Sequence, residues 1–173
     1  GFDKGYLKNS NQNKFTDFLK KKGVEFEKKI FNHIRSKYYT KTLQENSNYY
    51  ENYLKTLEMM NNGIPIIFHG VVFNIKEGMF GIPDIIIRSD YINKILNYPC
   101  IEKIDDMNIG CKFSERWHYL IIDIKFSNLV FRQDNHTLNN VGMFSYYKSQ
   151  VIFYNKCLEE MQKYLPKKAF ILG

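Results

Sequence analysis

The chain has 173 residues, of which 44% are hydrophobic and 25% charged, close to the averages of globular proteins, so it has room for one ordinary domain. None of its apolar runs approaches the roughly 18 to 20 residues that a membrane-spanning helix needs, so no membrane-embedded part is expected. The formal net charge of +7 is consistent with a polyanionic partner, and equally with the lysine- and asparagine-rich composition that an AT-rich genome imposes.

The N-terminal residues 1–13 are expected to form a flexible segment, because the polar run at 8–13 has too few apolar groups to order itself. Residues 14–173 are then expected to form a single domain. The sequence begins with glycine and without the basic-then-apolar pattern of a signal peptide. We therefore expect the domain to have been excised from a longer protein.

The first half of the chain has helical and then strand-like apolar spacing. Residues 15–38 predict two consecutive helices with a break or cap at Gly23, and residues 49–60 predict a further helix. Two segments rich in Ile, Val and Phe follow at 64–75 and 79–88. The short polar interval between them predicts a β-hairpin.

The second half begins with a polar interval at 89–115, in which only residues 91–96 have weakly helical spacing. Residues 117–126 are almost continuously apolar, which is typical of a central strand that is covered on both faces. A polar loop is expected after this strand, followed by a long helix at 141–165 and a last short strand at 168–172.

Charged residues stand at the ends of two of these strands. Asp123 and Lys125 lie two residues apart and therefore project from the same face of the central strand, either as a functional pair or as an ordinary ion pair where the strand reaches solvent. Asp84 follows Pro83 at the start of a hairpin strand, where it either ends the turn or converges with Asp123 if the two strands pair. Two carboxylates and a backbone carbonyl would form an oxygen-rich site suited to Mg²⁺ or Mn²⁺.

Polar residues also fall on the apolar faces of two predicted helices. Glu27 has the helical spacing of the core candidates Ile30 and Ile34, so its carboxylate either lies at the edge of that face or points inward. Gln150 lies on the apolar side of the last long helix, where its amide needs a partner. Tyr154, one turn later, has the spacing of a core residue or of a site residue.

The order of these residues resembles that of a known family. A glutamate on the first helix, Gly-Ile-Pro-Asp at 81–84, Asp-Ile-Lys at 123–125 and a Gln-x-x-x-Tyr at 150–154 are similar to the motifs of the PD-(D/E)xK nuclease superfamily, in particular its RecB-like branch. The resemblance spans residues 23–172. It implies an α/β fold with a restriction-endonuclease-like αβββαβ core, in which a mixed central sheet is flanked by helices.

The resemblance also implies roles for individual residues. Glu27, Asp84, Asp123 and Lys125 match the catalytic set of the superfamily. The three acids match its metal ligands, and the backbone carbonyl of Ile124 matches a further ligand. The expected cofactor is one or two Mg²⁺ or Mn²⁺ ions, with Lys125 orienting the attacking water or offsetting charge in the transition state.

The substrate implied by the resemblance is nucleic acid, with DNA favoured. Gln150 and Tyr154 match the signature that lines the substrate channel, and Lys148 is a candidate phosphate contact. Lysines 20–22, 28 and 29 are further candidates, although a solvated helix face explains them as well. Helicase or other replication and repair domains are expected partners in the longer protein.

Two alternatives to a DNA nuclease remain open. A catalytically inactive nucleic-acid-binding module would have the same fold, and a cap-snatching RNA endonuclease would have a similar site. Cap-snatching sites typically add a histidine in the first helix, whereas His33 lies off the face of Glu27 and is expected at the surface. His69 and His118 lie in predicted strands without paired ligand spacing and are interpreted as structural.

The number and spacing of the cysteines bear on the cellular compartment and on whether an iron–sulfur cluster is expected. Cys100, Cys111 and Cys157 are widely spaced and unpaired in sequence, which favours an intracellular, reducing compartment, either cytoplasm or nucleus. Some RecB-like nucleases bind an iron–sulfur cluster through four cysteines, one early and three late. The spacing here does not match, so we expect no such cluster.

Overall fold

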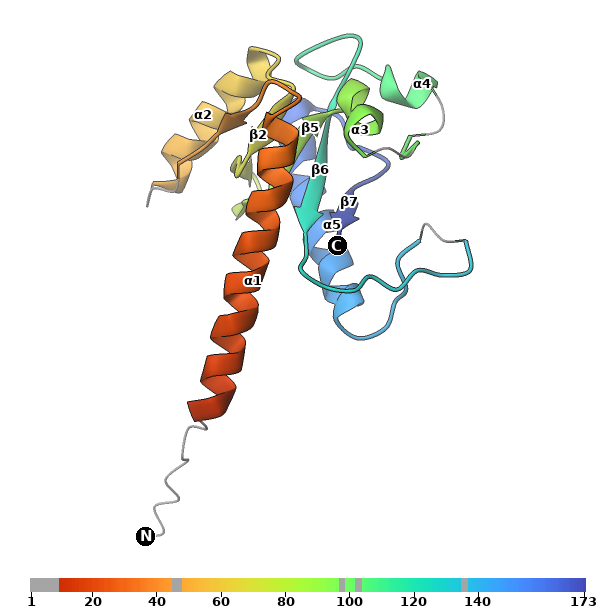
Figure 1. The fold of residues 1–173 in the computed structure, drawn as a ribbon. Helices are drawn as coiled ribbons and strands as arrows, with labels where there is room; N and C mark the ends of the chain where they lie inside the picture. The colour runs from red at the N-terminus through yellow and green to blue at the C-terminus, as the bar shows by residue number, and fades with distance from the viewer. Residues whose placement is uncertain (1–9, 45–47, 97–98, 102–103, 135–136) are drawn as a thin grey trace.

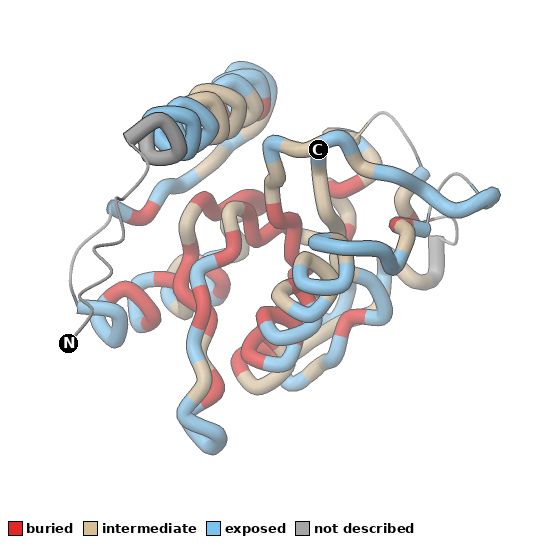
Figure 2. The backbone as a smooth tube through the Cα atoms, turned by 90° about the horizontal axis from the view of Figure 1, so that it is seen from below, coloured by how far each residue is buried: buried red, intermediate tan, exposed pale blue. Residues whose placement is uncertain are grey.

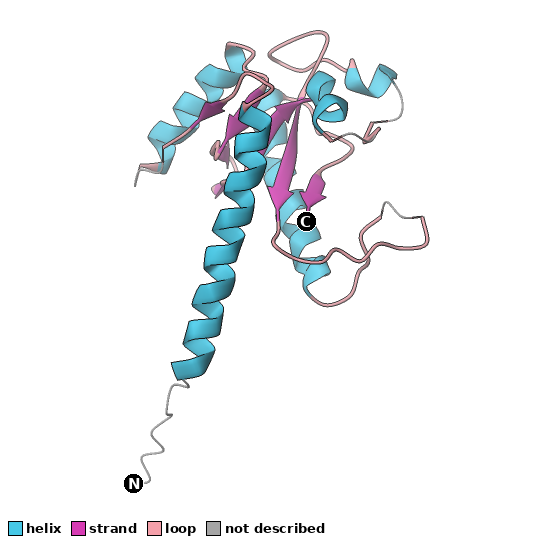
Figure 3. Ribbon diagram, viewed as in Figure 1, coloured by secondary structure: helices cyan, strands magenta, loops and turns pink. Residues whose placement is uncertain are grey.

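A computed structural model of the chain describes residues 10–44, 48–96, 99–101, 104–134 and 137–173. Most of the expected flexible segment, residues 1–9, lies outside this range. The described part folds as a mixed α/β structure in which helices cover both faces of one central sheet (Figures 1 and 3). Within the described residues, none of the helices combines the length and the apolar character that crossing a membrane requires.

The first helix, α1 (Ser10–Arg35), is continuous, so the prediction of two helices divided at Gly23 is wrong. A glycine inside a helix costs only about 1 kcal/mol relative to alanine, which the packing of the C-terminal half of α1 offsets. The apolar residues that suggested a separate helix, Phe15, Phe18 and Leu19, are exposed. They lie on the N-terminal half of α1, which extends past the rest of the molecule (Figure 1).

The central sheet has five strands in the order β1-β2-β5-β6-β7. Its pairings are antiparallel between β2 and β5 and between β5 and β6, and parallel at the two edges. The sheet is therefore mixed, as predicted. Its strands are β1 (Lys41–Thr42), β2 (Ile66–Phe68), β5 (Ile85–Arg88), β6 (Tyr119–Ile124) and β7 (Phe170–Leu172).

The predicted hairpin is present but divided between two sheets. Its outer parts, β2 and β5, pair in the central sheet, whereas β3 (Val72–Asn74) and β4 (Met79–Gly81) form a separate two-stranded sheet. The first strand is interrupted at His69, whose φ of +55° lies in the left-handed region. This interruption places a polar side chain between two apolar strands.

The core lies on both faces of the central sheet, so the prediction that β6 is covered on both faces is confirmed. Figure 2 shows the buried stretches of the backbone gathered in the interior of the molecule. Tyr119 and Ile121 face a cluster that includes residues of α2 (Tyr49–Asn61) and α5 (Met143–Gln162). Leu120 and Ile122 face the opposite cluster, formed with α1 and α3 (Ser89–Ile95). This alternation follows the two-residue period of a strand.

The remaining segments connect these elements. α2 and α5 match the helices expected at 49–60 and 141–165, and α3 matches the weakly helical piece at 91–96. A further short helix, α4 (Ile104–Met107), lies in the polar interval for which no structure was predicted. The chain between β6 and α5 is mostly irregular, as expected, and passes beside the first turns of α5 (Figure 1).

Candidate metal centre

Asp84 and Asp123 are neighbours across two paired strands. β5 and β6 are antiparallel with Ile85 opposite Ile122, so the residue before β5 lies beside the next residue of β6. The backbone N–H of Ile124 donates a hydrogen bond of 2.5 Å to Oδ2 of Asp84. The hydrogen bond across the paired strands therefore holds the Asp84 carboxylate in place. Its donor, Ile124, is the residue whose carbonyl oxygen was predicted to bind a metal.

Glu27 reaches the same place from α1. Phe31 and Ile34 lie on the buried side of this helix, and Glu27, one turn before Phe31, is half-buried. Its Oε1 atom lies 2.6 Å from Nε2 of His69. The inward orientation considered for Glu27 is therefore the one found in the structure.

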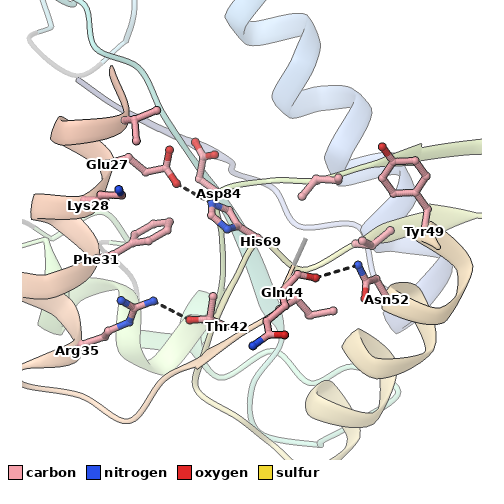
Figure 4. Close-up of a pocket in the computed structure, with 14 residues that line it drawn as sticks. Glu27, Lys28, Phe31, Arg35, Thr42, Gln44, Tyr49, Asn52, His69 and Asp84 are labelled. Carbon is pink, nitrogen blue, oxygen red and sulfur yellow. Dashed lines mark hydrogen bonds and ion pairs between the residues drawn. The ribbon is translucent and has the colours of Figure 1, made fainter. Parts of the chain in front are cut away.

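His69 joins the two acids to form a cluster. Ligand atoms of Glu27, His69 and Asp84 all lie within 4.8 Å of one another, as Figure 4 shows for their side chains. Two carboxylates and an imidazole suit a divalent cation such as Mn²⁺ or Mg²⁺, and imidazole is the better ligand for the transition metal. These residues could therefore hold one such ion.

The interpretation of His69 as a purely structural histidine missed this cluster. His69 lies 42 residues from Glu27 in sequence and belongs to no spaced ligand pair. One signal was present, because His-Gly inside a long apolar run marks a strand interruption. A left-handed residue other than glycine is strained, and such strain concentrates at functional sites.

We expect His69→Gly to separate metal binding from folding. Glycine adopts a φ of +55° without strain, which offsets the loss of the contacts of His69 with Glu27 and with the Phe31 ring, so the metal-free melting temperature should stay within about 4 °C of wild type. Loss of the imidazole should weaken Mn²⁺ binding by at least about tenfold, and Mg²⁺ binding by less. Calorimetric titration of both ions measures this. His33→Ala, at an exposed histidine of α1, is the control, and unchanged Mn²⁺ affinity in His69→Gly would remove His69 from the site.

Asp123 is buried and paired with Lys125. The Asp123 residue is 2% exposed, and its Oδ2 atom lies 2.6 Å from Nζ of Lys125. The ammonium also lies over the ring of Tyr147, at 5.3 Å from its centroid. The pair is thus not the solvated ion pair considered from the sequence. Asp123 lies beside the cluster of Glu27, His69 and Asp84 without belonging to it.

The surroundings of Asp84 disfavour its charged form. Burial raises the pKa of the Asp84 carboxyl to about 7, and the neighbouring carboxylates of Asp123 and Glu27 act in the same direction. The N–H of Ile124 and the ammonium of Lys125 oppose this shift. A buried group of acids that repel one another favours a bound cation, which would neutralise their charge.

Tyr154 lies within electrostatic range of the two strand-end acids, and Gln150 is hydrogen-bonded to it. The Gln150 amide donates a 2.8 Å hydrogen bond to the Tyr154 hydroxyl, while its buried Oε1 atom has no hydrogen-bond partner among the described residues. Burial raises the pKa of Tyr154 to about 12, and the charges of Asp123 and Asp84 contribute to the shift. The ring of Tyr154 packs on Gly81, where an added Cβ would collide with it.

Lys148, which was predicted to contact phosphate, uses its ammonium group for hydrogen bonds within the protein. Its ammonium donates hydrogen bonds to the carbonyl of Leu138 and to Oδ1 of Asn140, which ties the loop before α5 to this helix. Lys22 likewise forms an ion pair with Glu25. Lys28, in contrast, lines the pocket beside the metal centre.

Two further histidines among the described residues, His33 and His118, lie outside the cluster. His33 is exposed, with Nε2 at 3.2 Å from the Lys37 ammonium. His118 is buried, its Nδ1 atom lies 2.8 Å from the carbonyl oxygen of Ile109, and burial lowers its pKa. The surface position predicted for His33 and the structural interpretation of His118 agree with these contacts.

Comparison with protein-family models, with curated proteins and with solved structures finds no match for this chain.

Proposed function

We propose that the chain is a metal-dependent nuclease that hydrolyses phosphodiester bonds of DNA, with a restriction-endonuclease-like core of the PD-(D/E)xK type. The element order α1-β2-β5-β6-α5-β7 supports this core. The observation that carries the proposal is the meeting of Glu27, Asp84 and the Asp123–Lys125 pair at one end of the paired strands β5 and β6.

Each residue has a distinct part in the proposed reaction. A divalent cation held by Glu27, His69 and Asp84 would supply a Lewis acid and a water molecule of lowered pKa. The Lys125 ammonium, restrained by Asp123, would orient that water or stabilise negative charge on the phosphate. The Tyr154 hydroxyl, whose pKa responds to both acids, and the Gln150 amide that is hydrogen-bonded to it would contact substrate phosphates.

A specific observation favours the RNA endonuclease as a second candidate. Cap-snatching sites typically add a histidine to the acids, and His69 supplies an imidazole here, although from the interruption between β2 and β3 rather than from the first helix. Cleavage assays on both nucleic acids therefore decide between DNA and RNA as the substrate.

Cleavage of end-labelled DNA and RNA, each single- and double-stranded, tests the proposal. We expect cleavage of DNA with Mn²⁺ or Mg²⁺ and none with a chelator, with the rate lowered by about a hundredfold or more in Glu27→Gln because a ligand charge is lost. Glu25→Gln, two residues away and paired with Lys22, is the matched control for contaminating nucleases. Cleavage of RNA alone would select the second candidate. No metal-dependent cleavage of any substrate would refute both.

A further inference from the structure

A pocket of about 900 Å³ extends from the metal centre towards α2. Glu27, His69 and Asp84 lie together on one side of it, Arg35 lies further along α1, and Tyr49 and Asn52 lie across the pocket on α2 (Figure 4). Apolar side chains, including those of Phe31 and Val71, also line the pocket. The pocket is therefore continuous with the proposed reaction site but extends well beyond the residues that could hold a metal.

Arg35 is an oriented cation in this pocket. Its guanidinium lies over the rings of Phe31 and Phe68, at 5.9 and 5.1 Å from their centroids, and donates a 2.8 Å hydrogen bond to Oγ1 of Thr42. Among the described residues, no carboxylate forms an ion pair with Arg35. A guanidinium has five N–H donors, so this one retains donors for an anion.

The distance from the metal centre to Arg35 fits a short stretch of nucleic acid. Arg35 follows Glu27 by eight residues on the same helix, which is about 12 Å along the axis. Each strand of a B-form duplex rises by about 3.4 Å per nucleotide along the axis, and an unpaired strand can extend further per nucleotide. A phosphate bound by Arg35 would therefore lie a few nucleotides from a phosphate at the metal centre.

Aromatic surface lies on the α2 side of the pocket, where Tyr49 lines the pocket and Phe80 lies beside Tyr49. Tyr49 is 45% exposed, and its ring centroid lies 5.0 Å from that of Phe80, which is 42% exposed. These rings come from α2 and β4 and continue into the partly buried Phe73. Adjacent exposed aromatic rings stack on unpaired bases, whose faces are hidden in a duplex.

We propose that this pocket binds an unpaired stretch of one or a few nucleotides next to the scissile phosphate, with Arg35 on a phosphate and Tyr49 and Phe80 against a base. The inference rests on the proposed nuclease function and specifies its substrate as a single-stranded segment. The volume is in the range of about 300–1,000 Å³ typical of small-molecule sites, which accommodates nucleotides but not a duplex.

Binding is measured without cleavage, by fluorescence anisotropy of labelled single-stranded oligothymidine and of a blunt duplex, both with a chelator. We expect tighter binding of the single strand by about tenfold or more, since stacking of one base contributes about 5- to 150-fold in affinity. Tyr49→Ala should lower single-strand affinity by about fivefold or more. Arg35→Gln should weaken it and reduce the salt slope by about 0.7, the value for one phosphate contact.

Lys14→Gln is the matched control, because it removes one exposed positive charge from α1 outside the pocket and at a position not proposed as a phosphate contact. A parallel assay with Mn²⁺ compares cleavage of a blunt duplex, a duplex with an overhang and a single strand. If Arg35→Gln and Tyr49→Ala bind the single strand like wild type, or if the blunt duplex is bound and cut as well as the single strand, the pocket assignment is wrong while the nuclease proposal stands. If both variants lose single-strand binding although no substrate is cut, the pocket stands and the nuclease proposal is wrong.

Discussion

Asp84→Asn is expected to abolish metal binding and cleavage while leaving the fold intact. The amide oxygen of asparagine still accepts the hydrogen bond from the N–H of Ile124, so the local backbone should be unchanged. Loss of the charged ligand should weaken Mn²⁺ binding by about a hundredfold or more. Cleavage should fall by at least about a thousandfold, since a metal contributes several kcal/mol of charge stabilisation.

The same variant should remove a pH dependence of stability. Between the ordinary aspartate pKa of 3.8 and about 7, the folded protein keeps a proton on Asp84 that the unfolded chain has lost. The free energy of unfolding of the metal-free protein should therefore fall as pH rises through this interval, by at most about 1.4 kcal/mol per unit, and level off above it. Asp84→Asn should lack this contribution.

Chemical denaturation at several pH values, with calorimetric Mn²⁺ titration, measures both effects. Asp17→Asn, at an exposed position of α1, is the control that should change neither. Wild-type Mn²⁺ affinity in Asp84→Asn would place the metal elsewhere. An unchanged pH dependence of unfolding would mean that Asp84 is ionised in the folded protein across this range.

Lys125→Met is expected to destabilise the metal-free protein strongly as well as to impair cleavage. It would leave the buried carboxylate of Asp123 without its ammonium partner. Breaking a buried pair in this way costs about 3–5 kcal/mol. For a chain of this length, that corresponds to a fall in melting temperature of about 6–20 °C. Turnover should also fall by about a hundredfold or more, because a positioned charge in the transition state is lost.

A double-mutant cycle separates the pair from the single residue. Asp123→Asn combined with Lys125→Met should recover much of the lost stability but none of the activity, because no unpaired charge stays buried. Lys167→Met, which breaks a comparable pair with Asp106 at the surface, should cost no more than about 1 kcal/mol. If Lys125→Met melts at the wild-type temperature, the Asp123–Lys125 pair does not contribute the stability expected of a buried ion pair. If its turnover is unchanged, Lys125 has no part in the chemistry.

The sequence predicted the parts of the fold that depend on local patterns. The apolar run of β6 and the helical spacing of α5 are properties of single segments, and both elements formed close to the expected bounds. The convergence of Asp84 and Asp123 required only one further assumption, that the neighbouring strands pair. Two acids at strand ends were therefore within reach of sequence reasoning.

The parts that could not be predicted depend on contacts between distant segments. His69 reaches Glu27 only because the chain turns away from β2, and periodicity does not reveal that turn. Lys148 looked like a free cation because the loop that it binds has no pattern of its own. The continuity of α1 through Gly23 was missed because the N-terminal half of this helix packs against little of the protein. Apolar spacing cannot show that a helix continues beyond the part that is packed.

The contact between Gly81 and Tyr154 links two positions that are far apart in sequence. Gly81 is small here because the tyrosine ring fills the space where a side chain would be. An alanine at 81 therefore requires a smaller or displaced residue at 154, so the two positions are expected to vary together in evolution. A search that scores positions 81 and 154 together should therefore separate distant homologues from chance matches better than a search that scores either motif alone.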